Sequence, residues 1–232
     1  MTWIADKRHR VYLRAATVVA LVGVFAGCSN ASQGRTSGPS TVPANALDGL
    51  LLSANTINDV MGTTNMVANP PFTNLGQHSN LLPNKNCLGI WEVGEATIYG
   101  DNLSGFRGQD LQQPATGAWD DRVVQAVASY PGTDAARAFF VASSDRWSKC
   151  TNHRVNITLN DQQLPSLWFG NLTKTDTELA IPVTEGEGES QKSCQRVLAV
   201  ANNVIIDVAA CSRNATDQAA TIAGKIKEHL KS

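Results

Sequence analysis

The stretch Cys194–Cys211 reads CQRVLAVANNVIIDVAAC and consists of two apolar runs that meet at Asn202-Asn203. Runs rich in valine and isoleucine predict β-strands, and asparagine tolerates the positive φ that a two-residue hairpin turn needs. With this turn, facing residues have numbers that sum to 405, so Cys194 lies opposite Cys211. By alternation from the turn, the cysteines form a non-hydrogen-bonded pair, whose Cα atoms lie roughly 4.5 Å apart, within the reach of a disulfide. The sequence therefore predicts a hairpin closed by its own disulfide.

The same register sorts the side chains of the hairpin onto two faces. One face is wholly apolar, and we expect it to point into the core: Val197, Ala199, Ala201, Val204, Ile206, Val208 and Ala210. The other face holds Cys194, Arg196, Leu198, Val200, Ile205, Asp207, Ala209 and Cys211. Arg196 and Asp207 are diagonal neighbours on it, close enough for an ion pair. We interpret them as a structural ion pair, with a ligand contact as the alternative.

The composition limits the classes of partner. The chain has 232 residues, a length typical of one domain or a domain with attachments, and 42% of them are hydrophobic, enough for a packed core. The first 27 residues contain four basic residues and one acidic residue, which leaves 15 basic and 19 acidic residues in the rest of the chain. Such a balance provides no basic surface for a phosphate backbone, so we expect no nucleic-acid partner.

The N-terminus resembles an export signal. A basic segment precedes Ala15–Gly27, an uncharged stretch that is too short to span a bilayer but typical of a signal peptide. It ends in Phe25-Ala26-Gly27-Cys28, which resembles the bacterial lipobox, with phenylalanine where leucine is usual. We therefore expect residues 1–27 to be a lipoprotein signal peptide. Cys28 would then carry the lipid that anchors the protein to the outer side of the cell membrane. An ordinary secretory signal with a free Cys28 is the alternative.

The remaining chain divides into a tether and a domain. Residues 28–44 are small and polar or Gly and Pro, which predicts a flexible tether, and the domain covers residues 45–232. With Cys28 lipidated, four cysteines remain in an oxidising compartment, and the hairpin selects Cys194–Cys211 and leaves Cys87–Cys150. No two cysteines have the spacing of a metal knuckle, so we expect neither a metal site nor a cofactor.

Hydrophobic periodicity then predicts the order of elements. We expect helices at 53–62, at 133–150 and from Asn214 to the C-terminus, strands at 88–93, 96–99, 122–130, 155–159, 167–169 and 179–183, and loops at 63–86 and 100–117. Because strands mostly follow one another without a helix between them, the sheet should be mainly antiparallel. The predicted fold class is α+β, with the helices packed on one face of the sheet.

These pieces resemble the PknH-like extracellular domain family, the sensor domain of a mycobacterial receptor serine/threonine kinase and of related lipoproteins. The resemblance is carried by the hairpin with its two cysteines, by Gln125-Ala126-Val127 with Tyr130-Pro131, by Ala138-Phe139-Phe140 with Trp147 and Cys150, and by Cys87 with Tyr99. It covers roughly residues 45–232. It implies an antiparallel sheet flanked by helices, two disulfides and a broad cleft for an unidentified ligand. Because the resemblance is to the extracellular part of the kinase, we expect no kinase activity from this chain.

No catalytic motif stands out. The sequence contains no GxSxG, GxxxxGK[ST], HExxH or EF-hand pattern. We interpret His78, His153 and His229 as solvent-facing or structural. The pair Asp120-Asp121 could serve a hydrolase with two carboxylates, but a solvated strand end is the favoured interpretation.

Aromatic residues indicate where a ligand could bind. Trp91 and Trp147 are interpreted as packing residues, whereas Trp119 and Trp168 lie near predicted strand ends, where a cleft could expose them to a carbohydrate or a lipid headgroup. The candidate ligand-binding residues are Trp119, Trp168, Arg196 and Asp207. The sequence thus predicts a lipid-anchored, non-catalytic sensor domain for a small molecule, glycan or lipid. A protein-interaction module of the cell envelope, or a cell-wall-directed hydrolase, is the alternative.

Overall fold

A computed structural model describes residues 41–231, all of which belong to the unit that begins at Gly38. The predicted signal peptide, Cys28 and tether residues 29–40 lie outside the described residues. Within the described part, no helix has the length and the apolar character that crossing a membrane requires.

The hairpin predicted from the sequence forms the middle of the structure. Strand β10 (Lys192–Ala201) pairs antiparallel with β11 (Val204–Ser212), and Cys194 lies opposite Cys211 as the turn predicts. The two cysteines form a disulfide with their Cα atoms 4.0 Å apart. In the turn, Asn202 has the positive φ of 52°. The buried side chain of Asn203 instead accepts a hydrogen bond from Val42 N and donates to Val42 O and Tyr130 O. It thereby fastens the turn to two neighbouring segments.

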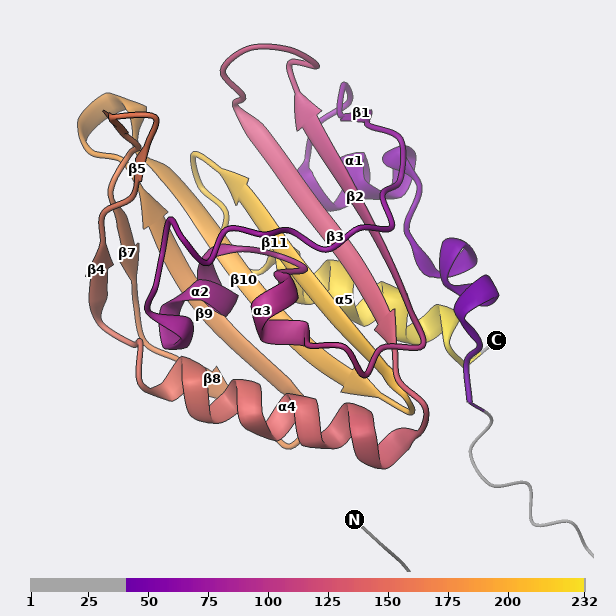
Figure 1. The fold of residues 1–232 in the computed structure, drawn as a ribbon. Helices are drawn as coiled ribbons and strands as arrows, with labels where there is room; N and C mark the ends of the chain where they lie inside the picture. The colour runs from indigo at the N-terminus through magenta and orange to yellow at the C-terminus, as the bar shows by residue number, and fades with distance from the viewer. Residues whose placement is uncertain (1–40, 232) are drawn as a thin grey trace, which may run out of the picture. The chain divides into compact units, whose positions relative to one another are not determined.

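The hairpin is part of a nine-stranded sheet in which every strand pair is antiparallel (Figure 1). Its order is β1 (Val67–Ala68), β2 (Gly105–Gln113), β3 (Asp121–Ser129), β11, β10, β9 (Glu178–Glu185), β7 (Leu167–Phe169) and β4 (His153–Val155), and β8 (Thr173–Lys174) also pairs with β9. A separate ribbon consists of β5 (Thr158–Leu159) and β6 (Gln162–Gln163). The predicted α+β class with a mainly antiparallel sheet is confirmed.

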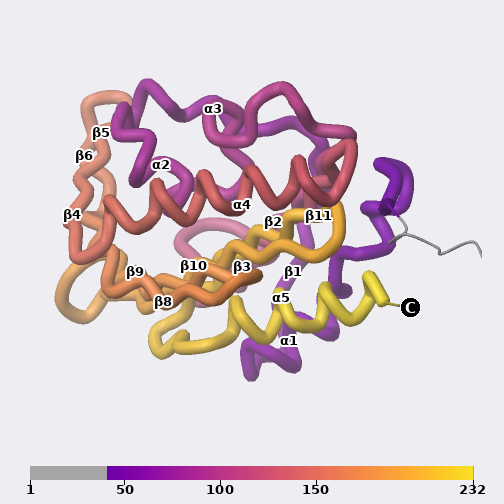
Figure 2. The backbone as a smooth tube through the Cα atoms, turned by 90° about the horizontal axis from the view of Figure 1, so that it is seen from below, coloured from indigo at the N-terminus to yellow at the C-terminus, as the bar shows by residue number. Residues whose placement is uncertain are grey.

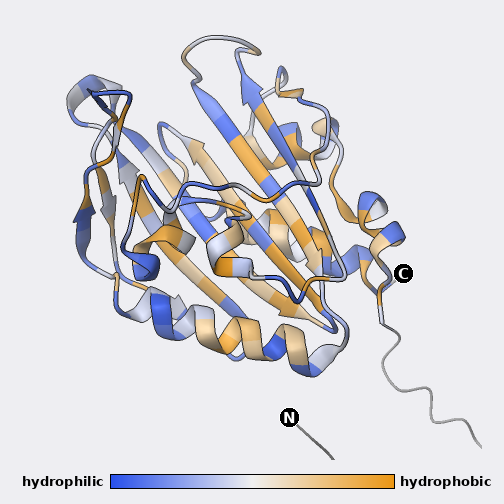
Figure 3. Ribbon diagram, viewed as in Figure 1, coloured by the Kyte–Doolittle hydropathy of each residue, from blue (hydrophilic) through white to orange (hydrophobic). Residues whose placement is uncertain are grey.

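Helices cover both faces of the sheet, whereas the sequence predicts them on one face only (Figure 2). On one face lie α2 (Lys85–Trp91), α3 (Ala96–Tyr99) and α4 (Thr133–Ser148), and on the other lie η1 (Ala44–Leu50), α1 (Ala54–Met61) and α5 (Gln218–His229). The predicted core face of the hairpin packs under α5, with Val197, Ile206 and Val208 fully buried. The second face also carries Leu198, Val200 and Ile205, and apolar residues on both faces require two covering layers. Figure 3 shows how far apolar residues dominate β10 and β11.

Several predicted elements differ from the structure. Residues 88–93 and 96–99 belong mostly to helices α2 and α3 and not to strands; Asn84 caps α2 by accepting a hydrogen bond from Asn86 N. The predicted loop at 100–117 contains β2, a polar strand whose side chains find partners, such as Asp110 with Arg122. Helix α5 begins at Gln218 and not at Asn214, whose backbone N donates to Ser212 Oγ.

Candidate functional site

A cleft of about 540 Å³ opens on the sheet face that carries α2. Its floor comes from the central strands, with Val124 of β3, Val183 of β9, Ala209 of β11 and the Cys194–Cys211 disulfide. One wall is formed by loop residues 72–78 and by the end of α2, and the opposite wall by the segment 157–169. Apolar side chains therefore line most of the floor and the second wall. A cavity of this size, mostly apolar with a few polar groups, is typical of a small-molecule site.

The second disulfide holds the first wall in place. Cys87 of α2 is bonded to Cys150 just after α4, with the Cα atoms 5.3 Å apart. Both predicted disulfides are therefore present. His153 lies near this pair, and the three residues are the only group of metal-type ligands found in residues 41–231. Because the two cysteines are bonded to each other, neither offers a thiolate to a metal ion.

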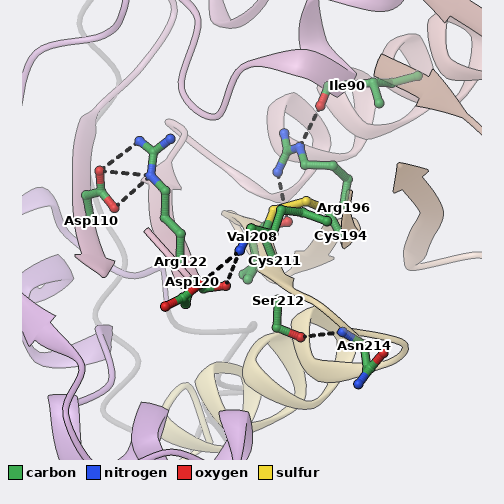
Figure 4. The surroundings of a disulfide bond; sticks show 11 residues. Ile90, Asp110, Asp120, Arg122, Cys194, Arg196, Val208, Cys211, Ser212 and Asn214 are labelled. Atoms are coloured by element: carbon green, nitrogen blue, oxygen red, sulfur yellow. Dashed lines mark hydrogen bonds and ion pairs between the residues drawn. A yellow bond between two sulfur atoms is a disulfide. The ribbon is translucent and has the colours of Figure 1, made fainter. Parts of the chain in front are cut away.

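Arg196 and Asp207 form the ion pair that the register predicts. Arg196 Nη1 lies 2.7 Å from Asp207 Oδ1, and both side chains are almost completely buried. Arg196 lines the cleft, but it also donates hydrogen bonds to the carbonyl oxygens of Ile90 and Val208 (Figure 4). It donates a third to the carbonyl oxygen of Gly89, so its donors are occupied.

Asp207 does not reach the cleft. Its Oδ2 accepts hydrogen bonds from Tyr99 OH at 2.9 Å and from Gly94 N at 3.3 Å. Burial, followed by the charge of Asp207, raises the pKa of the Tyr99 hydroxyl, which favours the protonated, donating form. The Arg196–Asp207 pair thus joins the sheet to α2 and α3, which is the structural role we favoured for it.

Charged residues gather at one end of the cleft. Arg122 of β3 forms a forked ion pair with Asp110 of β2, in which Nη2 lies 2.8 Å and Nε 3.1 Å from carboxylate oxygens (Figure 4). Glu92, directly after α2, and Glu185 of β9 are close enough for their charges to act on Arg122. Burial raises the pKa of both glutamates, although Arg122 lowers each of them in part. This cluster, which we call the polar end, consists of Glu92, Asp110, Arg122 and Glu185.

His78 lies beside the polar end and is held by a buried carboxylate. Glu95 is completely buried, and its Oε2 accepts a hydrogen bond from His78 N at 2.9 Å and lies 3.4 Å from His78 Nδ1. The other oxygen, Oε1, has no hydrogen-bond partner within the part of the chain that the structure describes. His78 lines the cleft, with its ring edge-on to Trp91 at 5.9 Å. His78 is therefore fixed to the cleft wall through its backbone, while its side chain is partly exposed to the cleft.

The four tryptophans of residues 41–231 differ in burial and in whether they line the cleft, and only part of this matches the prediction. Trp147 lies on the buried side of α4, and Trp91 is partly buried in the cleft wall. Trp119 lines the cleft, and Lys192 Nζ lies 5.4 Å from the centre of its ring. Trp168 is 47% exposed but does not line the cleft, because its neighbours Leu167 and Phe169 take the inward positions of β7. Of the predicted ligand-binding residues, the structure brings Trp119 and Arg196 to the cleft and leaves Trp168 and Asp207 outside it.

The paired carboxylates of the hydrolase alternative lie outside this cleft. Asp120 is exposed and forms an ion pair with Lys192 at 3.2 Å, and Asp121 lines a separate, smaller hollow near Arg213. His153 and His229 are both exposed, in β4 and at the end of α5.

Sequence reasoning missed Glu92, Asp110, Arg122 and Glu185. These residues belong to no motif. The one signal that could have revealed part of the cluster is diagonal pairing: once β2 and β3 are known to be neighbours, Asp110 and Arg122 fall on one face two positions apart.

The comparisons with known proteins agree with this architecture. The sequence matches the family model of the PknH-like extracellular domain over residues 42–228, which include every wall of the cleft. The chain belongs to the PknH-like extracellular domain family. A crystal structure of the extracellular domain of PknH from Mycobacterium tuberculosis matches with a TM-score of 0.77 and 30% identity, over 84% of this chain and 99% of that one.

Full-length kinases of this family are longer than the chain. It is 31% identical over 193 residues to serine/threonine-protein kinase PknH of Mycobacterium bovis and, equally, to that of Mycobacterium tuberculosis strain H37Rv. The alignments cover 83% of this chain but 32% and 30% of those proteins, so the chain spans about a third of their length. The similarity is to the extracellular domain of the kinases and not to their catalytic domain.

Proposed function

We propose that this PknH-like domain is a lipid-anchored, extracytoplasmic binding domain that takes a small molecule, glycan or lipid in its cleft without transforming it. The observation that carries the proposal is the cleft itself, about 540 Å³ in volume, with an apolar floor, several aromatic residues and one polar end. Ligand sites have this size and this combination of many apolar residues and few polar ones.

The composition of the cleft favours binding over catalysis. The residues that line it include no serine or threonine, and its two cysteines are joined in a disulfide. His78 has a buried carboxylate behind it but no hydroxyl or thiol nucleophile on the cleft surface beside it. A base without a hydroxyl or thiol nucleophile lacks one half of the arrangement that covalent catalysis of the serine or cysteine type needs.

The protein-interaction alternative has a weaker basis. The large apolar side chains exposed among residues 41–231 are Val67, Val141, Leu159 and Trp168, and they belong to four different elements. Interaction surfaces are formed by contiguous apolar patches. Trp168 is the residue that such a partner would contact first.

The cleft can be tested by filling it. Ala209 lies on the floor, so Ala209→Phe should occupy the cavity, whereas Val141→Phe introduces the same aromatic side chain on the exposed side of α4, away from the cleft. Both variants and the wild type would be purified from the native envelope, and co-purified molecules would be extracted and identified by mass spectrometry. We expect one class of small molecule to accompany the wild type and Val141→Phe and to be lost from Ala209→Phe. Equal recovery with all three proteins would show that the cleft is not the binding site.

A further inference from the structure

We propose that the polar end of the cleft binds a ligand group that donates hydrogen bonds and carries no negative charge, an ammonium or sugar-hydroxyl group attached to an apolar tail. This inference rests on the proposed function and names the ligand class that the cleft would select. Three features of the cleft support it: unused acceptors, occupied cations and an apolar surface next to both.

The first step is the unused acceptor capacity of two glutamates. The carboxylate of Glu185 forms no hydrogen bond or ion pair with any of residues 41–231, and the nearest cationic group to Glu92 is His78 Nδ1, at 4.0 Å. Both side chains line the cleft, and burial raises the pKa of each. A partly dehydrated carboxylate gains most from a donor that replaces its lost water. A bound ammonium or hydroxyl group would supply that donor.

The second step is that the nearby cations are already used. Arg122 directs its Nη2 and Nε at Asp110, and Lys192 forms an ion pair with Asp120. Arg196 is neutralised by Asp207 and saturated by backbone carbonyls. An anionic headgroup would therefore meet Glu92, Asp110 and Glu185 beside cations of residues 41–231 that are each already paired with a carboxylate. Like charges brought together in this way disfavour binding strongly.

The third step is the surface next to the polar end. Ile157, Leu167 and Phe169 form an apolar wall, and in the pairing of β7 with β9 Leu167 lies opposite Glu185 and Phe169 opposite Val183, so apolar side chains stand directly beside the carboxylate. Trp119 also lines the cleft and offers a ring on which a sugar can stack. A ligand with a donor group at one end and a hydrocarbon tail at the other would match both surfaces at once.

Three amphiphiles with the same octyl tail test this selection. Octylammonium, octyl glucoside and octyl sulfate would be titrated into the purified full chain below their micelle concentrations, with binding followed by calorimetry. We expect octylammonium or octyl glucoside, or both, to bind roughly tenfold or more tightly than octyl sulfate. Which of the two binds more tightly identifies an amine or a sugar as the donor. Octyl sulfate binding as tightly as the others would overturn the inference and leave the proposed function intact; no binding by any of them would count against both.

A matched pair of variants places the effect at the polar end. Glu185→Gln removes the charge from the cleft, whereas Glu189→Gln makes the same change at an exposed residue of η2 (Gly188–Ser190). We expect Glu185→Gln to weaken octylammonium by roughly tenfold and to strengthen octyl sulfate, and to leave octyl glucoside nearly unchanged, because an amide oxygen still accepts from a hydroxyl. Glu189→Gln should behave as the wild type. Unchanged octylammonium binding by Glu185→Gln, with circular dichroism showing a folded protein, would contradict the assignment.

Discussion

Single carboxyl groups in this protein have opposite roles according to what surrounds them. Asp207 and Glu95 are both buried, but Asp207 faces Arg196 and Glu95 faces His78, so each has a cationic or cation-forming neighbour. Glu92 is only partly buried and lies farther from its cation-forming neighbour, with His78 Nδ1 at 4.0 Å, and burial is the largest influence on its pKa. Asp207 and Glu95 support the fold, whereas burial makes the charged form of Glu92 unfavourable.

The pH dependence of stability tests this interpretation of Glu92. Burial raises its pKa above the ordinary value of 4.5, with partial opposition from His78, Arg196 and Arg122 and a small further increase from Glu95. Between the ordinary and the raised pKa the folded state binds more protons than the unfolded chain, so the free energy of unfolding falls as pH rises through this window. Glu92→Gln removes that loss. We expect the variant to be more stable than the wild type at neutral pH, with an advantage that shrinks as the pH falls through this window and is lost below pH 4.5.

Denaturant unfolding at neutral pH and below pH 4.5 would measure the difference in the free energy of unfolding between variant and wild type, with Glu189→Gln as the exposed control. A Glu92→Gln variant that is less stable than the wild type at neutral pH would show that the carboxylate is held by favourable contacts and not merely buried.

At the scale of elements, the two short helices depend on the sheet below them. Helices α2 and α3 have seven and four residues, too few to be stable alone. Arg196 binds the carbonyl oxygens of Gly89 and Ile90 in α2, and Asp207 binds Tyr99 of α3 and Gly94 between the helices. One ion pair on the hairpin therefore positions the cleft wall.

Asp207→Asn should accordingly destabilise the protein strongly. It leaves the Arg196 guanidinium buried without its counter-charge, a change that typically costs about 3–5 kcal/mol. We expect the free energy of unfolding in urea to fall by about 3 kcal/mol or more. The double variant Arg196→Met/Asp207→Leu should recover part of this loss, because no uncompensated charge remains. Asp217→Asn, just before α5, is the control. An Asp207→Asn variant as stable as the wild type would mean that the pair does not hold the helices.

The same elements show what the sequence can predict. The hairpin is predictable because its register depends only on a turn and two cysteines that are 17 residues apart. Residues 88–91 read Leu-Gly-Ile-Trp, a short apolar run whose periodicity does not separate strand from helix. Their helical state is stabilised by Arg196, more than 100 residues away. The polar end is assembled in the same way, by sheet pairing between segments that carry no local signal, so its residues could not be named in advance.

At the scale of the whole molecule, the proposal places a folded domain on a lipid anchor at Cys28. The test is Cys28→Ala, which removes the thiol that would carry the lipid. We expect the variant to move from the membrane fraction to the soluble fraction, because the lipid chains are the expected source of membrane affinity. Fractionation with an alkaline wash and immunoblotting would measure the distribution, with Cys28→Ser as a second variant. Retention of both variants in the washed membranes would contradict lipid anchoring.

The covalent bond between β10 and β11 has a mechanical meaning for the cleft. Because the Cys194–Cys211 disulfide joins β10 to β11 in the cleft floor, these two strands cannot move apart to admit a larger ligand. Any widening has to come from the flanks, where the stretch 72–78 is attached by hydrogen bonds between Phe72 and Gly108 and from Gly76 and His78 to residues 94–96. Binding and release of a ligand would thus involve movement of the side wall against a fixed floor.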